Sequence, residues 1–246
     1  MHESRFLCLA VSRKMNGYCI AGIDIDSGVW VRPVSADSYG ELCSREITVQ
    51  DHGTKRPRLM MPFDIVRLRL SKHEDKIGQP ENWILDLDSK TLPLSLLGQG
   101  SNDDSVLAQI RDLAKQSGSS SVLLRTQGKE ISRREIQKEP LSHSLCVIRP
   151  SNLTWVRTTN FKNKPRIEGW FDFGGRGIRY CLSLTDIAWE TKLLDLTVNG
   201  QTLDSTEVPG GDANFEILLT ISLGDLFEKT QCHYKLIAGV LLLPQK

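Results

Sequence analysis

The sequence predicts a mainly β protein with two small barrels joined by a partly helical connector. Three observations support this fold class. Short apolar runs separated by turn residues open the chain, an alternation of apolar and polar residues marks a strand at 63–70, and further strand candidates fill 144–246. Residues 91–140 differ from the rest of the chain, because they contain apolar residues with the spacing of a helix as well as charged stretches. We therefore predict an N-terminal barrel over 1–90, a connector over 91–140 and a C-terminal barrel over 141–246.

The first barrel begins with the stretch FLCLAVSRKMNGYCIAGIDIDSGVWVRPVS. Its apolar runs are Phe6–Val11, Tyr18–Asp24 and Val29–Val34, separated by Met-Asn-Gly and Asp-Ser-Gly. These tripeptides suit hairpin turns because Asn and Gly tolerate positive φ. The pattern predicts a three-stranded antiparallel meander. Gly22, inside the second run, indicates a sharp bend or a close approach of two backbones.

Two more strands complete the predicted first barrel. A polar excursion over 35–62, broken by Gly and Pro, contains a short strand near 46–50. FDIVRLRL at 63–70 then alternates well, and QPENW leads into a fifth strand at 84–86. Five strands interrupted by one long loop is the count of an OB-type barrel, a small closed Greek-key sheet.

The connector contains one predicted helix. Asp103 can cap it, and the apolar residues that follow have helical spacing up to about Gln116. The charge-dense segment KEISRREIQKE at 129–139 has only two apolar residues. We predict a solvated helix or an exposed strand there.

The second barrel is predicted from strand candidates that alternate with loops. A capping pair, Thr185-Asp186, precedes a short segment around Trp189, and the polar stretch 199–214 is predicted to be a loop. A basic loop occupies 158–166, and Gly-Gly-Arg-Gly at 174–177 is a flexible turn. The strand candidates are 144–149, 153–157, 168–173, 178–184, 215–223 and 234–243.

Composition limits the possible functions. The 246 residues carry a net charge of +1, with 39% hydrophobic and 25% charged residues. The chain is thus globular and not a polycation, so binding to nucleic acid would depend on local patches. It shows no signal-peptide pattern and no apolar run that could span a bilayer, so we expect a soluble, cytoplasmic protein. Six scattered cysteines without a Cys-x-x-Cys pair are expected to be buried free thiols, in preference to a zinc site or disulfides.

Five stretches of the chain carry a resemblance to a known family: CLAVSRKMNGYCIAGID, GVWVRPVS, QPENW, RYCLSLTD and ISLGDLF…YKLIAGVL. They resemble the bacterial dual OB-domain-containing family. The resemblance extends from Phe6 to Leu243 and excludes the connector. It rests on structural motifs and implies two OB-like barrels, no known active site, nucleic-acid binding and a link to bacterial conflict or anti-phage systems.

Charge and aromatic residues concentrate between Arg149 and Tyr180. This window holds seven basic residues, two acidic residues and six aromatic residues. Single-strand binding on an OB face requires cations along the phosphates and rings that stack on bases. Trp155 and Phe171 are expected to be core because apolar residues flank them. The candidate binding residues here are Arg157, Phe161, Lys162, Lys164, Arg166 and Arg176.

The first half adds three candidate cations. Arg13 and Lys14 lie at the first turn, and Arg32 forms a Trp-x-Arg pair with Trp30. This pair can contact a nucleotide or brace the barrel through a cation–π interaction. By contrast, residues 183–228 include nine acidic residues and one basic residue. Such a segment can form a solubilising face, a metal-binding surface or a docking site for a basic partner.

Enzyme motifs are missing from the sequence. It contains no G-x-S-x-G, no phosphate-binding glycine loop before a helix and no His-x-x-x-His. We therefore expect a non-catalytic module, without cofactor or metal, that binds single-stranded DNA or RNA. The alternative is a protein–protein adaptor that holds an effector enzyme.

Overall fold

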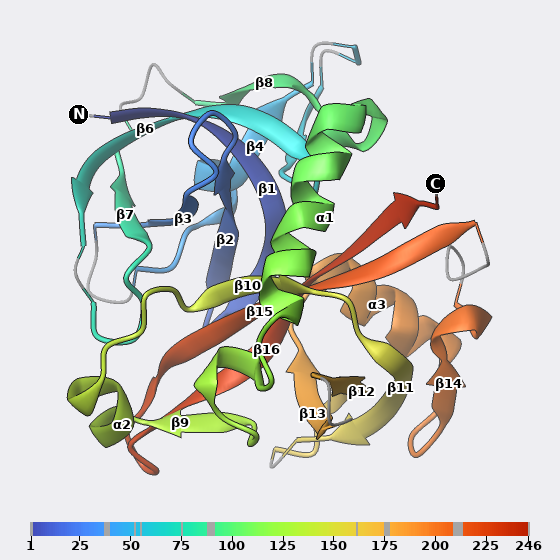
Figure 1. The fold of residues 1–246 in the computed structure, drawn as a ribbon. Coiled ribbons are helices and arrows are strands. Elements are labelled where there is room, and N and C mark those ends of the chain that lie inside the picture. The colour runs from blue at the N-terminus through green and yellow to red at the C-terminus, as the bar shows by residue number, and fades with distance from the viewer. Residues whose placement is uncertain are drawn as a thin grey trace. The chain divides into compact units, whose positions relative to one another are not determined.

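The computed structural model describes residues 2–36, 40–51, 53–54, 56–74, 76–87, 92–160, 162–174, 178–208 and 214–245. They form two compact units that divide between Gln109 and Ile110, within helix α1 (Asp104–Gly118). Strands dominate each unit (Figure 1), as the predicted fold class requires. The predicted connector over 91–140 is shared between the two units, because β8 (Leu94–Gln99) belongs to the first sheet. No described helix is both long enough and apolar enough to cross a membrane.

The first unit contains a closed five-stranded barrel. Its order is β1-β2-β3-β7-β6, and β6 pairs back onto β1. Neighbours are antiparallel except β3 and β7, which are parallel. This arrangement confirms the predicted meander and the two later strands. The strands are β1 (His2–Lys14), β2 (Gly17–Asp24), β3 (Trp30–Val34), β6 (Asp64–His73) and β7 (Asn82–Leu85).

The remaining strands of this unit extend the sheet beyond β6. β8 pairs with β6, and β4 (Thr48–Gln50) pairs with β8 and with β5 (Pro57–Leu59). β4 is the short strand predicted near 46–50, although a 3-10 turn over Ser44–Ile47 replaces its first residues.

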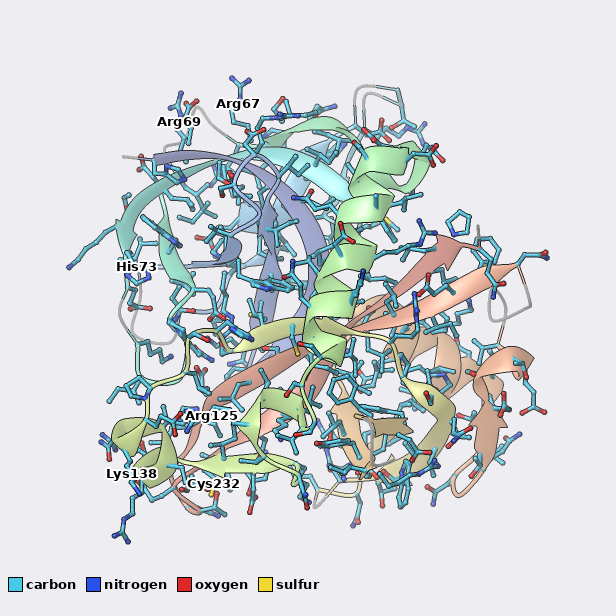
Figure 2. All side chains as sticks on the ribbon, viewed as in Figure 1. Arg67, Arg69, His73, Arg125, Lys138 and Cys232 are labelled. Carbon is cyan, nitrogen blue, oxygen red and sulfur yellow. The ribbon has the colours of Figure 1, made fainter. Side chains whose placement is uncertain are left out.

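The predicted turns and alternation of the first barrel are present. Gly28 adopts φ 71°, a positive value that the second turn signal favours, whereas in the first turn the positive φ, 49°, lies at Met15 and not at Asn16 or Gly17 as the Asn-Gly signal predicts. On β6, Leu68 is buried, whereas Arg67 and Arg69 point outward (Figure 2). Helix α1 begins as predicted, because the Asp103 carboxylate accepts a hydrogen bond from the backbone of Ser105 at 2.9 Å.

The second unit repeats the strand order of the first barrel with one interruption. β10 and β11 are consecutive and separated only by Arg149 and Pro150. β10 pairs with β15 and β11 pairs with β12, so together they act as one broken strand. β12, β13, β16 and β15 follow around the sheet, and β13 and β16 are the parallel pair. The strands are β10 (Leu145–Ile148), β11 (Ser151–Thr159), β12 (Pro165–Phe173), β13 (Ile178–Leu184), β15 (Phe215–Phe227) and β16 (Cys232–Pro244).

Helix α3 (Ile187–Leu196) follows β13, and Asp186 caps it as predicted by accepting from the Trp189 backbone at 3.0 Å. The predicted loop over 199–214 contains a short strand, β14 (Thr202–Asp204), which pairs with β11. Trp155 and Phe171 are fully buried, as predicted, because both belong to the hydrophobic core of this unit.

The charge-dense segment is part strand and part helix. β9 (Glu130–Ser132) pairs with β16, and α2 (Arg133–Lys138) follows directly. The Ser132 hydroxyl accepts from the Glu135 backbone at 3.2 Å, and the Glu135 carboxylate accepts from the Ser132 backbone at 2.9 Å. This capping box starts a helix immediately after the strand, which is why neither predicted alternative alone describes the segment.

The cysteines are less buried than predicted. Cys8 and Cys146 are buried, but Cys43 is exposed and the other three are partly exposed. The apolar runs of both units form strands, in which side chains alternate between the core side and the outer side. A cysteine within such a run therefore need not face the core.

Candidate nucleic-acid interface

The second unit exposes one face of β12 and β13. Side chains alternate between buried and accessible along both strands, as they do when one face of a sheet is solvated. At its centre, Trp170 is 38% exposed and lies opposite Cys181 in register. We call this surface the β12–β13 face; its residues are Arg166, Glu168, Trp170, Asp172, Arg179, Cys181 and Ser183.

The corresponding strands of the first barrel are covered on both faces. Every residue of Ile20–Asp24 in β2 and of Val31–Val34 in β3 is buried. After β3 the chain also pairs with the edge of β2, since Tyr18 and Leu42 exchange backbone hydrogen bonds of 2.8 and 2.9 Å. The outer side of β2 and β3 in this barrel is therefore closed to a ligand strand.

An ordered basic turn connects β11 to β12. The Asn160 side-chain oxygen accepts from the backbone of Lys162 at 2.8 Å and of Lys164 at 3.1 Å. Asn163 adopts φ 57°, a conformation that asparagine tolerates. We call Asn160, Lys162, Asn163 and Lys164 the lysine turn. Both lysine side chains are exposed, so the turn presents two cations at the start of β12.

The arginines of the β12–β13 face are paired with acids. Arg166 forms an ion pair with Glu168 and donates to the Thr158 hydroxyl at 3.2 Å. Arg179 lies 3.3 Å from Asp172. A hydrogen bond from Asn152, together with Arg179, lowers the pKa of Asp172. The face is therefore close to neutral, and the net positive charge beside it comes from the lysine turn.

The Cys181 thiol is not activated. Burial, followed by a hydrogen bond to Glu168 at 3.2 Å, raises its pKa to about 11. A thiol with such a pKa is almost entirely protonated at neutral pH and is a poor nucleophile. Within the described ranges, no three His, Cys, Asp or Glu side chains are grouped as metal ligands.

The predicted cations are distributed over several places. Lys162, Lys164 and Arg166 come together at the start of β12, whereas Arg13 and Lys14 end β1 in the first unit. Phe161 and Arg176 lie outside the described residues.

Two predicted arginines occupy structural positions. Arg32 is 1% exposed within the first barrel. Arg157 shares the inward side of β11 with Trp155, and its guanidinium donates to the carbonyl oxygen of Leu194, at 2.9 Å, and to that of Thr197. These two carbonyl groups lie at the C-terminal end of α3, where the helix dipole and the unpaired carbonyl oxygens favour a cation. In these positions, neither guanidinium is presented on the β12–β13 face.

Two residues of the face that could contact a nucleic acid directly, Trp170 and Arg179, were not among the candidates. Trp170 has the opposite parity to Ile167 and Phe171 in its strand, and the same argument applies to Arg179 beside Tyr180. Strand parity was the signal that could have identified both residues.

Comparison with known proteins gives one match. Residues 4–240 match the family model of the dual OB-containing domain, which covers the chain from β1 into β16. No curated protein and no solved structure matches the chain.

Proposed function

The chain belongs to the dual OB-containing domain family, and from this premise we propose that it binds single-stranded nucleic acid on the β12–β13 face. OB barrels commonly bind oligonucleotides across their second and third strands and the adjoining loops. In the second unit these strands are β12 and β13, and the lysine turn is the loop that precedes them. The observation that carries the proposal is that this face is solvated while the equivalent face of the first barrel is buried.

The two kinds of side chain have different roles in this proposal. Lys162 and Lys164 contact phosphates, and the exposed Trp170 ring stacks on a base. Two phosphate contacts on a single strand give a salt dependence of about −1.4 in log K against log salt, because each contributes about −0.7. Binding is therefore moderate in affinity and weak in sequence preference, since neither contact reads base edges.

No reaction forms part of this proposal. Its support is the sequence, which has no catalytic motif, and the raised pKa of Cys181, which disfavours a thiolate nucleophile. The resemblance to bacterial dual OB proteins adds the proposal that binding serves a conflict or anti-phage system.

The test is fluorescence polarisation with labelled single-stranded and double-stranded oligonucleotides at two salt concentrations. We expect single strands to bind more tightly and to lose affinity at high salt. Equal binding of both forms, or no dependence on salt, would contradict the proposal.

A partner protein is the second candidate ligand. Leu196 and Val198 are exposed at the end of α3, next to the exposed carboxylate of Asp195. A mixed apolar and acidic surface of this kind fits a basic protein partner better than a polyanion. Co-purification of one protein in a fixed ratio, with no oligonucleotide binding, would favour this adaptor function.

A further inference from the structure

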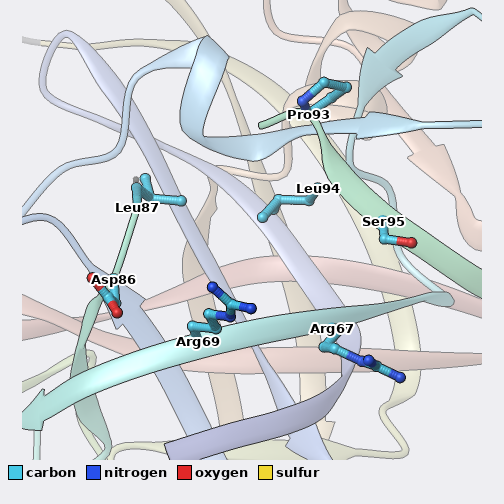
Figure 3. Close-up of a pocket in the computed structure, with 7 residues that line it drawn as sticks. All are labelled: Arg67, Arg69, Asp86, Leu87, Pro93, Leu94 and Ser95. Atoms are coloured by element: carbon cyan, nitrogen blue, oxygen red, sulfur yellow. The ribbon is translucent and has the colours of Figure 1, made fainter. Parts of the chain in front are cut away.

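A hollow lies on the first barrel where β7 and β8 leave β6. β8 pairs with β6 up to Val66, and β7 pairs with it from Leu70 onward. The residues between these pairings face the segment that follows β7 and the start of β8. The space has a volume of about 250 Å³, and Figure 3 shows its lining: Arg67 and Arg69, Asp86 and Leu87, and Pro93–Ser95. We call it the β6–β8 hollow.

Two arginines line this hollow from one side of β6. Residues two apart on a strand share a face and lie about 7 Å apart. Arg69 is 3.5 Å from Glu3, but both side chains are about half exposed, so the pair contributes little. The Arg67 side chain forms no hydrogen bond or ion pair with another described residue. Among the described residues, the hollow therefore offers one guanidinium without a counterion and a second that is only weakly paired.

The sheet register increases the positive potential at Arg67. Arg67 lies directly opposite Arg5 on β1, and like charges in this position destabilise a sheet. Arg5 also forms an ion pair with Asp26 at 2.7 Å, but both side chains are more than half exposed, so this pair offsets its charge only in part. An anion bound at Arg67 would relieve the repulsion between the two guanidinium groups.

The other walls add different chemistry. Asp86 lies on the segment from β7 and Ser95 lies on β8, with Arg69 between them in Figure 3. Neither side chain has a hydrogen bond within the described part of the chain. Leu87 and Leu94 provide an apolar surface beside them. A matching ligand has an anionic group for the arginines, hydroxyl groups for Asp86 and Ser95, and a small carbon skeleton.

We propose that the β6–β8 hollow binds a sugar phosphate, either free or as part of a nucleotide. Arginine suits phosphate because its planar fork can donate two parallel hydrogen bonds. The carboxylate of Asp86 accepts from sugar hydroxyls and repels a second phosphate, which disfavours a continuous nucleic-acid strand. The volume is also below the 300–1,000 Å³ or so that drug-sized ligands occupy. This site is separate from the β12–β13 face.

The probes are ribose 5-phosphate, ribose, inorganic phosphate and AMP, each titrated into the full chain by calorimetry. Ribose 5-phosphate should bind saturably and at least ten times more tightly than ribose or inorganic phosphate. AMP distinguishes the sources: tighter binding than ribose 5-phosphate identifies a nucleotide, and equal or weaker binding identifies a free sugar phosphate. No saturable binding of ribose 5-phosphate, or equal binding of inorganic phosphate, would overturn the proposal.

Variants link the binding to the hollow. Arg67→Gln with Arg69→Gln should weaken ribose 5-phosphate binding at least tenfold, whereas Arg45→Gln, an exposed arginine of the Ser44–Ile47 turn, should change nothing. Asp86→Asn should weaken ribose 5-phosphate but not inorganic phosphate, because only the sugar needs the carboxylate. Unchanged binding in the double variant, with unchanged circular dichroism, would refute the site. Oligonucleotide binding measured on the same variants should be unaffected, so failure here leaves the β12–β13 proposal separately testable.

Discussion

The Lys235 amino group donates to both the carbonyl and the hydroxyl oxygen of Thr126, at 2.6 and 2.7 Å. A third acceptor, the Gly128 carbonyl, lies at 2.7 Å, and the Thr126 hydroxyl uses its own hydrogen on Glu130 at 3.1 Å. All three acceptors therefore require a donor from Lys235, which favours the ammonium form. The side chain is only 1% exposed, and this burial lowers its pKa to about 7. Lys235 thus ties the segment before β9 to the interior of the second unit.

Replacing Lys235 with Met should destabilise the protein and change its pH dependence. The loss leaves buried acceptors unsatisfied, at a cost of about 2–3 kcal/mol. In the unfolded chain Lys235 holds its proton to about pH 10.5, whereas the folded chain releases it near 7. The folded state then binds fewer protons between these values, so the parent gains stability as pH rises from 7 to 9. Urea unfolding at pH 7, 8 and 9 should show this gain in the parent only; parallel curves would contradict it.

Gly22→Val should be severely destabilising, by roughly 2–4 kcal/mol. A Cβ at Gly22 would lie 1.9 Å from the Leu7 carbonyl oxygen and 2.9 Å from the Phe6 ring. The close approach occurs beside a register shift between Cys8 and Ala10, where β1 bulges against β2. Gly98→Ala is the matched control, because nothing lies within 4 Å of its added Cβ. A melting temperature for Gly22→Val equal to that of the control would rule out the steric explanation.

Asp186 should make the protein less stable as pH rises from 4 to 6. The carboxylate accepts from the backbones of Trp189 and Val240, both at 3.0 Å, yet burial raises its pKa to about 6. The folded state then holds a proton that the unfolded chain releases near 3.8, so stability falls across this interval. Asp186→Asn removes the titration. The stability of the parent minus that of this variant should be greater at pH 4 than at pH 7; an unchanged difference would show that Asp186 does not titrate in this range.

Replacing Lys162, Lys164 and Arg166 with Ala should weaken single-strand binding about equally for all sequences. The salt slope should flatten by about 1.4 if the two lysines contact phosphates, and by about 2 if Arg166 leaves Glu168 to join them. The fold should be retained, because these charges are largely exposed and contribute little to stability. Lys115→Ala with Lys138→Ala, on exposed positions of α1 and α2, is the matched control. Polarisation assays that do not distinguish the two variants would exclude the lysine turn.

Trp170→Ala should reduce single-strand affinity by about 1–3 kcal/mol with little effect on the salt slope, as expected for loss of one stacked base. Trp170→Phe keeps a ring and should recover part of the affinity. Because Trp170 is exposed on the sheet, thermal unfolding of the two variants should be similar. An alanine variant with the affinity of the parent would remove Trp170 from the interface.

Local sequence patterns were sufficient to predict the positions of most strands, turns and helix caps. The turn at Gly28 requires positive φ, and side chains at Asp103 and Asp186 satisfy backbone groups within a few residues of themselves. Alternation along β6 also indicated which side chains share a face. All these features depend on neighbours in the sequence, so the sequence by itself determined them.

Only the tertiary structure decided which faces are accessible. Arg32 is buried within the first barrel, and the Arg157 guanidinium donates to a carbonyl oxygen at the end of α3. The hollow at Arg67 arises because two distant strands leave β6 on the same side. Periodicity assigns a side chain to one side of its strand, but it does not indicate which other parts of the chain pack against that side. The exposed β12–β13 face therefore follows from long-range packing, which no local pattern encodes.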